Sequence, residues 1–247
     1  MVDWCLLVID NKSHLINLDF KIVEIKNFGN FPSDFLKKQE IGIEFDLFGK
    51  SSKLLPYNLS DIQRNLQRGP QIISPKDISW IIYDLDVKSN DIIVEAGGGS
   101  GALTTALAQS AFPDGKVITF EKNKKHYNIV KKNLELSPYS ELVELRNEEL
   151  LNQTKSIPCN SIILDLPEPQ NLIIWAENSL KLGGKILCYV PTINQVETLL
   201  SSLGKWSEIN ISEIIHRKWR TKLDAIRPDT NIIGHTGFMV SARLLNK

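Results

Sequence analysis

Two stretches of the sequence combine acidic residues with turn residues in spacings that could bind a ligand. The first is DIIVEAGGGSG at residues 91–101, where an apolar run leads through Glu95 into a glycine turn. Glycines allow a tight turn, and they allow backbone N–H groups and the N-terminus of a following helix to approach a ligand closely. The stretch therefore predicts a buried strand, a turn that binds a nucleotide-type cofactor, and a packed helix that reaches Gln109.

Two cofactors compete for this turn. Gly97, Gly99 and Ala102 satisfy the dinucleotide fingerprint, which is a weak signal by itself. Glu95, however, stands where dinucleotide binders usually have an apolar residue, and its carboxylate can meet a positively charged ligand group. The order acid, x, Gly, x, Gly, x, Gly resembles motif I of S-adenosylmethionine (SAM) methyltransferases. With either cofactor, Glu121, about 20 residues beyond the turn, is placed to bind ribose hydroxyls.

The second stretch is IILDLPEP at residues 162–169, an apolar strand that ends in Asp165 and two prolines. In a methyltransferase sheet this strand lies beside the glycine turn, so Asp165 would lie where the acceptor atom meets the methyl group. Its closest relative is the Asp/Asn-Pro-Pro-aromatic loop of amino methyltransferases. The alternative is an ordinary aspartate that initiates a turn before proline.

Length and composition limit the class of protein. The 247 residues suit a main domain with a small appendage, and 42% hydrophobic with 23% charged residues is ordinary for a globular chain. There is no membrane-length apolar run and no signal peptide, so we expect a cytoplasmic protein without membrane association. Three widely spaced cysteines predict neither disulfides nor a metal site. Because 29 basic residues balance 29 acidic ones, any nucleic-acid binding would come from local patches.

The chain is expected to divide near residue 57. Residues 1–57 contain short β-rich runs at 4–9, 14–18, 20–25 and 41–48, and they predict a small N-terminal β-domain. Residues 58–247 form the main domain. It starts with a helix whose apolar residues are Leu59, Ile62 and Leu66, followed by a helix that begins at Pro75.

The rest of the main domain alternates between strands and helices. Strands are expected at 116–120, 142–146, 161–164, 185–190, 208–216 and 235–244, with helices at 124–136, 172–180 and 194–203. Such alternation predicts an α/β fold with a parallel, doubly wound sheet that binds ligands at its strand C-terminal ends. The last two strands have no helix between them. An antiparallel closing pair matches the seven-stranded, Rossmann-like SAM-methyltransferase sheet better than a dinucleotide-binding fold.

Five stretches in this order resemble the tRNA (adenine-N1)-methyltransferase family, from residue 58 to the end of the chain. They are Arg68-Gly-Pro-Gln71 with Pro75-Lys-Asp77, Glu95 to Thr104, Asp165 to Pro169, Tyr189-Val-Pro191 with Asn194-Gln-Val196, and Gly234-His-Thr-Gly-Phe238. The resemblance implies a SAM-dependent enzyme that methylates N1 of adenine 58 in the tRNA T-loop, and in archaeal members also adenine 57. It also implies a homotetramer.

The resemblance assigns roles to individual residues. Asp165 would orient the adenine through its N6 amino group and disperse the positive charge that methylation develops. One departure concerns the end of the third strand, where the family often has an acidic residue facing the SAM adenine; here Asn147 or Glu148 could take that role. The residues implied to bind SAM are Gln71, Glu95, Gly97, Gly99, Ser100, Gly101, Ala102, Leu103, Glu121, His126, Asn147, Glu148 and Asp165.

Contacts with tRNA are expected at two places. Arg64 and Arg68 precede the crevice, and residues 216–222 (HRKWRTK) mix cations with an aromatic ring that can stack on a base. A solvated connection between the last two strands is the alternative interpretation of the second place. The residues implied to contact tRNA are Arg64, Arg68, Tyr189, Asn194, Arg217, Lys218, Arg220 and His235.

Two other functions fit the sequence. One is a methyltransferase that acts on a protein or a small molecule. The other is a catalytically silent subunit, such as pairs with the catalytic subunit in eukaryotic homologues. The intact turn from Glu95 to Gly101, together with Asp165, argues against a silent subunit, because such a subunit would not need them.

Overall fold

The structure is a computed structural model that describes residues 4–25, 28–69 and 71–246. It divides into two compact units, Met1–Gln67 with Glu135–Pro138, and Arg68–Leu134 with Tyr139–Lys247. The helix α2 (Leu59–Asn65) belongs to the first unit, whereas the sequence had placed it with the main domain. A capping box closes the start of α2. The Asn58 side chain accepts the Asp61 N–H, and the Asp61 carboxylate accepts the Asn58 N–H. That residues 1–57 and 58–247 act as separate domains stays a prediction.

The first unit is built on a small antiparallel sheet in the order β2-β1-β6-β5. Its strands are β1 (Trp4–Ile9), β2 (Lys12–Asn17), β5 (Glu44–Asp46) and β6 (Ser51–Leu55). A hairpin of β3 (Ile22–Ile25) and β4 (Gly29–Pro32) and the short helix α1 (Ser33–Lys37) complete the unit. The expected strand at 41–48 was too long, because Gly42 and Gly49 adopt left-handed φ values of 84° and 78° and turn the chain at both ends of β5.

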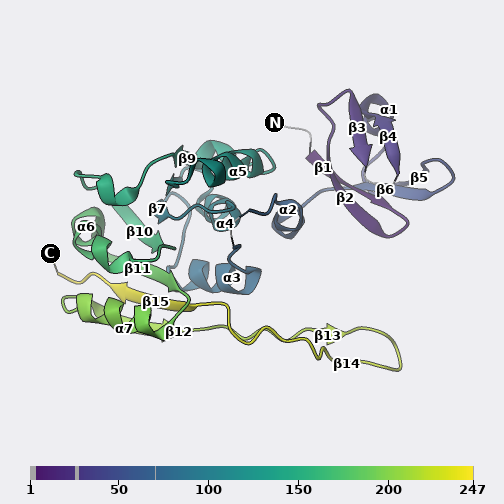
Figure 1. Cartoon of the computed structure of the whole chain (residues 1–247). Helices are drawn as coiled ribbons and strands as arrows, with labels where there is room; N and C mark the ends of the chain where they lie inside the picture. The colour runs from purple at the N-terminus through teal and green to yellow at the C-terminus, as the bar shows by residue number, and fades with distance from the viewer. Residues whose placement is uncertain (1–3, 26–27, 70, 247) are drawn as a thin grey trace. The chain divides into compact units, whose positions relative to one another are not determined.

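The second unit is organised around a seven-stranded sheet in the order β12-β15-β11-β10-β7-β8-β9 (Figure 1). The parallel strands are β7 (Ile92–Ala96), β8 (Lys116–Phe120), β9 (Val143–Arg146), β10 (Cys159–Leu164) and β11 (Leu180–Val190). Strand β15 (Phe238–Arg243) pairs antiparallel with both β11 and β12 (Ser207–Ser212). The predicted seven-stranded sheet with an antiparallel closing strand is confirmed.

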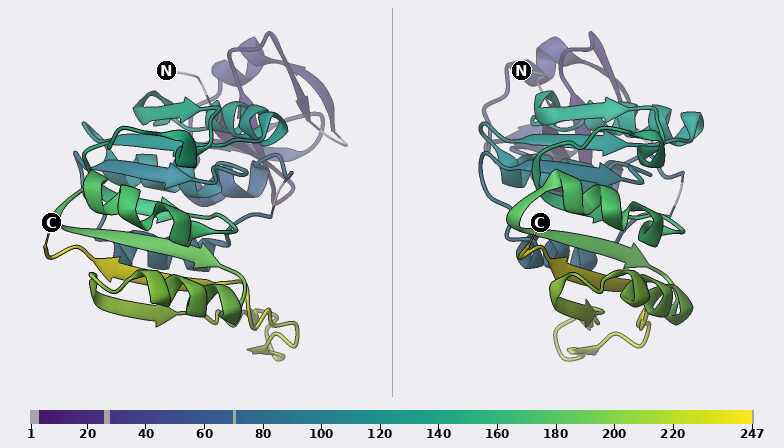
Figure 2. Two further views of the ribbon diagram at one scale, coloured as in Figure 1. Left: turned by 60° about the vertical axis from the view of Figure 1, so that its left-hand side comes forward. Right: turned by 90° about the vertical axis from the view of Figure 1, so that its left-hand side faces the viewer.

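Helices cover both faces of this sheet (Figure 2). On one face lie α3 (Pro75–Asp84), which precedes the glycine turn, and α4 (Ala102–Ala111) and α5 (Lys124–Leu134), which follow it. On the other, α6 (Ile173–Ser179) and α7 (Ile193–Ser202) pack on β11 and β15. The central strands are largely apolar on both faces, as in Ile162, Ile163 and Leu164 of β10, all fully buried, because helices exclude water from each side.

The connection between β12 and β15 is a long hairpin that leaves the sheet, and we call residues 213–237 the arm (Figure 1). Its only regular pairing in the described structure joins β13 (Trp219–Arg220) to β14 (Arg227–Pro228). The sequence had extended the two flanking strands to residues 216 and 235, but they end at Ser212 and begin at Phe238. Among the described residues, no helix is long and apolar enough to span a bilayer.

Candidate active site

The glycine turn and Asp165 are brought together by the pairing of β7 with β10. The Asp165 N–H donates to the carbonyl oxygen of Ala96 at 2.9 Å, which continues the ladder one residue beyond β10. Gly97 has a left-handed φ of 94°, and a Cβ atom there would lie 2.1 Å from the carbonyl oxygen of Asp165. Only glycine fits this position, because both the backbone angle and the approach of Asp165 exclude a side chain. The first ligand-binding stretch thus touches the second.

Glu95 lies in the strand rather than at its end, and it faces α4. Its carboxylate is buried and accepts hydrogen bonds from the hydroxyls of Thr104, at 2.6 Å, and Thr119, at 2.8 Å. Burial raises the pKa of Glu95 to about 7, which the two threonine hydroxyls oppose and the charges of Asp165 and Glu121 reinforce. A cationic ligand group in the adjoining pocket would therefore stabilise the ionised carboxylate.

Glu121 directly follows β8 and is buried, with both carboxylate oxygens held by backbone groups. Its Oε2 accepts the N–H of Gly99 at 2.9 Å, and its Oε1 accepts the N–H of Asn123 at 2.8 Å. The Asn147 amide donates to the carbonyl oxygen of Glu121 at 2.8 Å, and His126 Nδ1 lies 3.9 Å from Glu121 Oε1. The turn, the end of β8 and the end of β9 are thereby fixed relative to one another.

Two pockets meet at Gly97 and Asp165. The larger, of about 320 Å³, is lined by Glu121, His126 and Glu148, and by residues of the loop that follows Asp165. The smaller, of about 10 Å³, is a shallow niche on the other side of the turn. Its predicted lining residues are Gln71, Glu95, Gly97, Gly99, Ser100, Ala102, Leu103 and Asp165, to which the structure adds Ile73 and Gly98. Asp165 and Gly97 are the residues that line both pockets.

Acidic groups dominate the meeting point of the two pockets. Burial, and then the neighbouring charge of Glu121, raise the pKa of Asp165 to about 6. Three carboxylates, those of Glu95, Glu121 and Asp165, thus lie around one glycine turn, and the pKa values of Glu95 and Asp165 are raised. Such a site favours a ligand that carries positive charge, and the larger pocket has the apolar walls that a flat aromatic group needs.

Most of the residues predicted to contact tRNA have exposed side chains. Arg64 pairs with Asp61 within the first unit, while Arg68 and Asn194 are exposed in the second. In the arm, Arg217, Lys218 and Arg220 are exposed, and Arg220 lies 3.6 Å from the carboxylate of Asp229. These side chains are available to a partner, and their contact with tRNA stays a prediction.

Two of the predicted tRNA contacts already have partners inside the protein. Tyr189 is 7% exposed, and its hydroxyl donates to Asp77 at 3.3 Å. The His235 ring is held between the Glu213 carboxylate, 2.9 Å from Nδ1, and the Pro191 carbonyl oxygen, 3.1 Å from Nε2. Both partners of His235 are acceptors, and the Glu213 hydrogen bond is the main reason why the pKa of His235 is raised.

Sequence reasoning missed several residues that hold the site together. Thr104 and Thr119 bind Glu95, and the Gln195 amide donates to the carbonyl oxygen of Pro167 at 2.9 Å, which ties α7 to the loop after Asp165. Thr104 and Thr119 could have been found, because each is a polar residue inside an apolar run, and a buried polar group needs a hydrogen-bond partner. Gln195 carried no such signal, since its partner is a backbone group of a loop distant in sequence.

Comparisons with known proteins agree with this geometry. The family model described as "tRNA methyltransferase complex GCD14 subunit" matches residues 62–231. The tRNA (adenine(57)-N(1)/adenine(58)-N(1))-methyltransferase TrmI of Methanocaldococcus jannaschii is 31% identical over 89% of this chain and 89% of that protein. The structure of the tRNA (m1A58) methyltransferase TrmI from Aquifex aeolicus has a TM-score of 0.79 and 26% identity, covering 99% of this chain and 98% of that one. A SAM-dependent O-methyltransferase from Thermotoga maritima has a TM-score of 0.85 and 28% identity, covering 99% and 94%.

Proposed function

The chain belongs to the tRNA methyltransferase family described by the GCD14 subunit, and from this premise we propose that it methylates N1 of an adenine in the tRNA T-loop with SAM as methyl donor. The target is adenine 58, and adenine 57 as well if the chain acts as the name of its M. jannaschii relative states. Nucleoside mapping of the product shows whether adenine 57 is methylated in addition to adenine 58.

The two pockets at Gly97 suit the two ends of SAM. The larger pocket, whose lining includes Glu121 and Glu148, would hold the adenosine, with Glu121 on the ribose hydroxyls. The niche lined by Gln71, Glu95 and Ser100 would hold the amino-acid end, with backbone N–H groups of the turn facing its carboxylate. The acidic surroundings suit the ammonium and sulfonium charges of SAM.

Bound SAM supplies an electrophilic sulfonium methyl group, which passes to the lone pair of neutral adenine N1. No strong base is needed to prepare that lone pair, so the protein contributes mainly by positioning. Asp165, where both pockets meet, would accept a hydrogen bond from the adenine N6 amino group and would stabilise the positive charge that develops on the ring. Extraction of the base from the folded tRNA costs a few kcal/mol, which contacts elsewhere must offset.

The observation that carries this proposal is the position of Asp165, which lines both pockets and is held against the glycine turn through Gly97. The test is incubation with labelled SAM and unmodified tRNA, followed by nucleoside mapping of the product. A transcript with guanine at position 58 is the matched control, and it should lose the product at that position. Label that enters protein or a small molecule instead, or no label transfer despite SAM binding, would contradict the proposal and favour the alternatives.

Replacement of Glu121 by alanine is expected to weaken SAM binding by about 1.5 to 3 kcal/mol, the range for hydrogen bonds to a charged group. The reason is loss of the ribose acceptor, together with release of the Gly99 N–H that Glu121 now holds. Calorimetry of SAM binding to the folded variant measures the effect. Glu149→Ala is the control, because Glu149 lines the same pocket but pairs with Lys122 instead of the glycine turn. Equal SAM affinity in wild type and Glu121→Ala would remove Glu121 from the ribose site.

We propose that the arm binds tRNA phosphates through Arg217, Lys218 and Arg220. Neutralisation of all three is expected to raise the Kd for tRNA and to reduce its salt dependence by up to about three units of slope, because fewer counterions are released on binding. SAM affinity should not change. Neutralisation of Lys131, Lys132 and Lys205, which are exposed outside the arm, is the matched control for total charge. A salt slope equal to that of the wild type would assign the arm cations to ordinary solvated surface.

We also propose that the protein works in the cytoplasm as a homotetramer. The support for association is the set of exposed apolar side chains on the arm, which include Ile215, Leu223, Ile226 and Ile233 at 63%, 78%, 64% and 70% exposure. Exposed apolar groups of this number mark surfaces that associate. Light scattering that gives the mass of one chain at micromolar concentration would reject the tetramer.

A further inference from the structure

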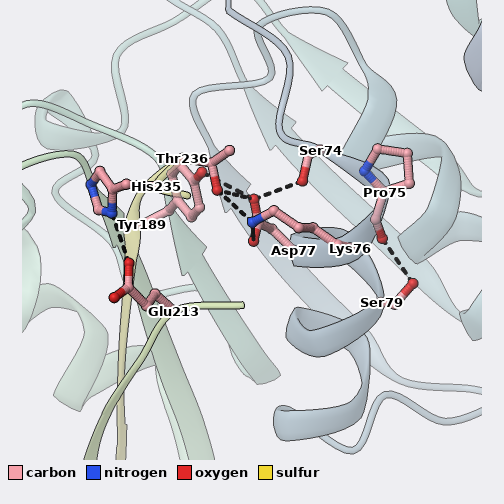
Figure 3. A network of polar contacts seen from close by, with 9 residues as sticks. All are labelled: Ser74, Pro75, Lys76, Asp77, Ser79, Tyr189, Glu213, His235 and Thr236. Atoms are coloured by element: carbon pink, nitrogen blue, oxygen red, sulfur yellow. Dashed lines mark hydrogen bonds and ion pairs between the residues drawn. The ribbon is translucent and has the colours of Figure 1, made fainter. Parts of the chain in front are cut away.

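A buried carboxylate outside the two pockets accepts an unusual number of hydrogen bonds. Asp77, in the first turn of α3, is fully buried. Its Oδ2 accepts the hydroxyls of Ser74 at 2.8 Å, Thr236 at 2.7 Å and Tyr189 at 3.3 Å, and its Oδ1 accepts Lys76 Nζ at 2.6 Å (Figure 3). A buried carboxylate is tolerated when it is paired and hydrogen-bonded, and here the Lys76 ammonium supplies the opposite charge.

These donors come from three separate segments. Ser74 and Lys76 belong to the start of α3, Tyr189 to the end of β11, and Thr236 to the base of the arm (Figure 3). Lys76 Nζ also donates to the Thr236 hydroxyl at 2.6 Å, so Thr236 joins both members of the ion pair. Asp77 therefore holds the start of α3 against the strand and the arm at one point.

The segment that Asp77 holds leads directly into the smaller pocket. Gln71 and Ile73 line that pocket opposite Glu95 and the glycine turn. In the part of the chain that the structure describes, no backbone hydrogen bond joins residues 71–73 to another segment. The polar contacts that fix this wall of the pocket are therefore those made just after it, at Ser74, Lys76 and Asp77.

The contact of Tyr189 adds an electrostatic link to the site. Burial is the main reason that the pKa of Tyr189 rises to about 12, and the charges of Asp77 and Asp165 add to it. The Tyr189 hydroxyl thus lies within electrostatic reach of the carboxylate that lines both pockets. Gly237 packs on its ring, since a Cβ atom there would lie 2.5 Å from the ring carbon Cζ. The ring cannot turn toward the arm without displacing the backbone.

We propose that Asp77 is a positioning residue for the methyl-transfer site. With Tyr189 and Thr236 it fixes the Gln71 to Ile73 wall against the glycine turn, and so it sets the affinity for the amino-acid end of SAM. The inference rests on the proposed function, because it assigns that end of SAM to the smaller pocket. Asp77 touches neither ligand, and it acts through the segment that precedes it.

The test compares SAM binding in three variants by calorimetry, at a temperature well below the Tm of each protein. Asp77→Asn keeps the size but turns an N–H₂ group toward donors, and its Kd for SAM is expected to rise about tenfold or more. Thr236→Val removes one hydroxyl without change of shape, and a smaller rise, about threefold, is expected. Ser179→Ala is the control, because the buried Ser179 hydroxyl likewise joins two segments, by accepting the Ile157 N–H at 3.1 Å, but lines neither pocket.

A double-mutant cycle separates positioning from general destabilisation. If Asp77 acts through the wall, Gln71→Ala combined with Asp77→Asn should weaken SAM binding by less than the product of the two separate effects. SAM affinity that is unchanged in Asp77→Asn, or lowered equally in Ser179→Ala at the same loss of Tm, would overturn the inference. A wild-type protein that binds no SAM would instead reject the proposed function, and SAM binding without RNA methylation would reject only the choice of acceptor.

Discussion

Replacement of Gly97 by alanine is expected to lower the rate of methyl transfer on the order of 10²-fold, the typical cost of misplacing a reacting group by about 1 Å. A Cβ atom at Gly97 would meet the Asp165 carbonyl oxygen at 2.1 Å, and the left-handed φ of 94° adds strain. The chain relieves the clash by moving either the turn or Asp165. Because Gly97 lines both pockets, either movement changes the place where they meet.

The matched control for this variant is Gly183→Ala. Gly183 has a similar left-handed φ of 82°, but a Cβ atom there meets nothing within 4 Å and the residue lines neither pocket. Both variants should therefore lose stability through backbone strain of roughly 1 to 2 kcal/mol, and only Gly97→Ala should lose SAM affinity and single-turnover rate. Chemical denaturation, calorimetry and single-turnover kinetics on both proteins measure these effects. A fully active Gly97→Ala would show that the turn and Asp165 can move apart without consequence.

Most of the second unit could be predicted from the sequence because its signals are local. Apolar strands such as residues 116–120, helices with apolar spacing and the missing helix before the last strand together predicted a mainly parallel sheet with an antiparallel closing pair, as the structure shows. The first unit was predicted less well. Strand β6 (Ser51–Leu55) has the short, mixed sequence SSKLL, and its pairing with β1 depends on residues distant in the chain. Such pairing leaves no periodic trace within five residues.

The site shows the same division between local and distant signals. The glycine turn and the strand ending at Asp165 could be recognised because each is one continuous stretch. The Asp77 network could not, because Lys76, Tyr189 and Thr236 meet only after the sheet brings β11 beside β15. An acidic residue in the first turn of a helix is favoured by the helix dipole alone, so the position of Asp77 in the sequence carried no sign of a network. Its burial and its three hydroxyl donors are properties of the tertiary structure.

The carboxylate of Asp165 destabilises the free protein at neutral pH. Its pKa in the fold, about 6, lies above the ordinary value of 3.8, so the folded protein binds the proton more tightly than the unfolded chain does. The stabilisation from protonated Asp165 is present below pH 3.8 and is lost as the pH rises to about 6. Above that pH, Asp165→Asn should therefore raise the free energy of unfolding, which denaturation at two pH values would measure. A carboxylate that lowers the stability of the fold in this way is expected to have a role in function.

Asp165→Asn is expected to lower turnover by on the order of 10²- to 10³-fold, the cost of losing one preorganised group that stabilises developing charge. Asparagine keeps the size, but its N–H₂ group can face the adenine N6 amino group, so orientation and charge stabilisation both suffer. Binding of tRNA should change far less, because most of its affinity would come from phosphate contacts such as those of the arm. The measurement is single-turnover methylation with saturating tRNA and SAM. A variant with a near wild-type rate would make Asp165 an ordinary turn residue before proline.

The pH dependence of kcat/KM identifies the role of the carboxylate more directly, because this quantity reports the ionisation of the free enzyme. Ionised Asp165 offers only acceptor oxygens to the N6 amino group, whereas protonated Asp165 carries an O–H that cannot accept this hydrogen bond. Its pKa of about 6 therefore predicts that kcat/KM falls as the pH decreases through 6 in the wild type. The Asp165→Asn variant should lack this fall, while a dependence near pH 7 that comes from Glu95 would remain in both proteins. If the two profiles have the same shape, the carboxylate does not take part in methyl transfer, whatever the loss of rate.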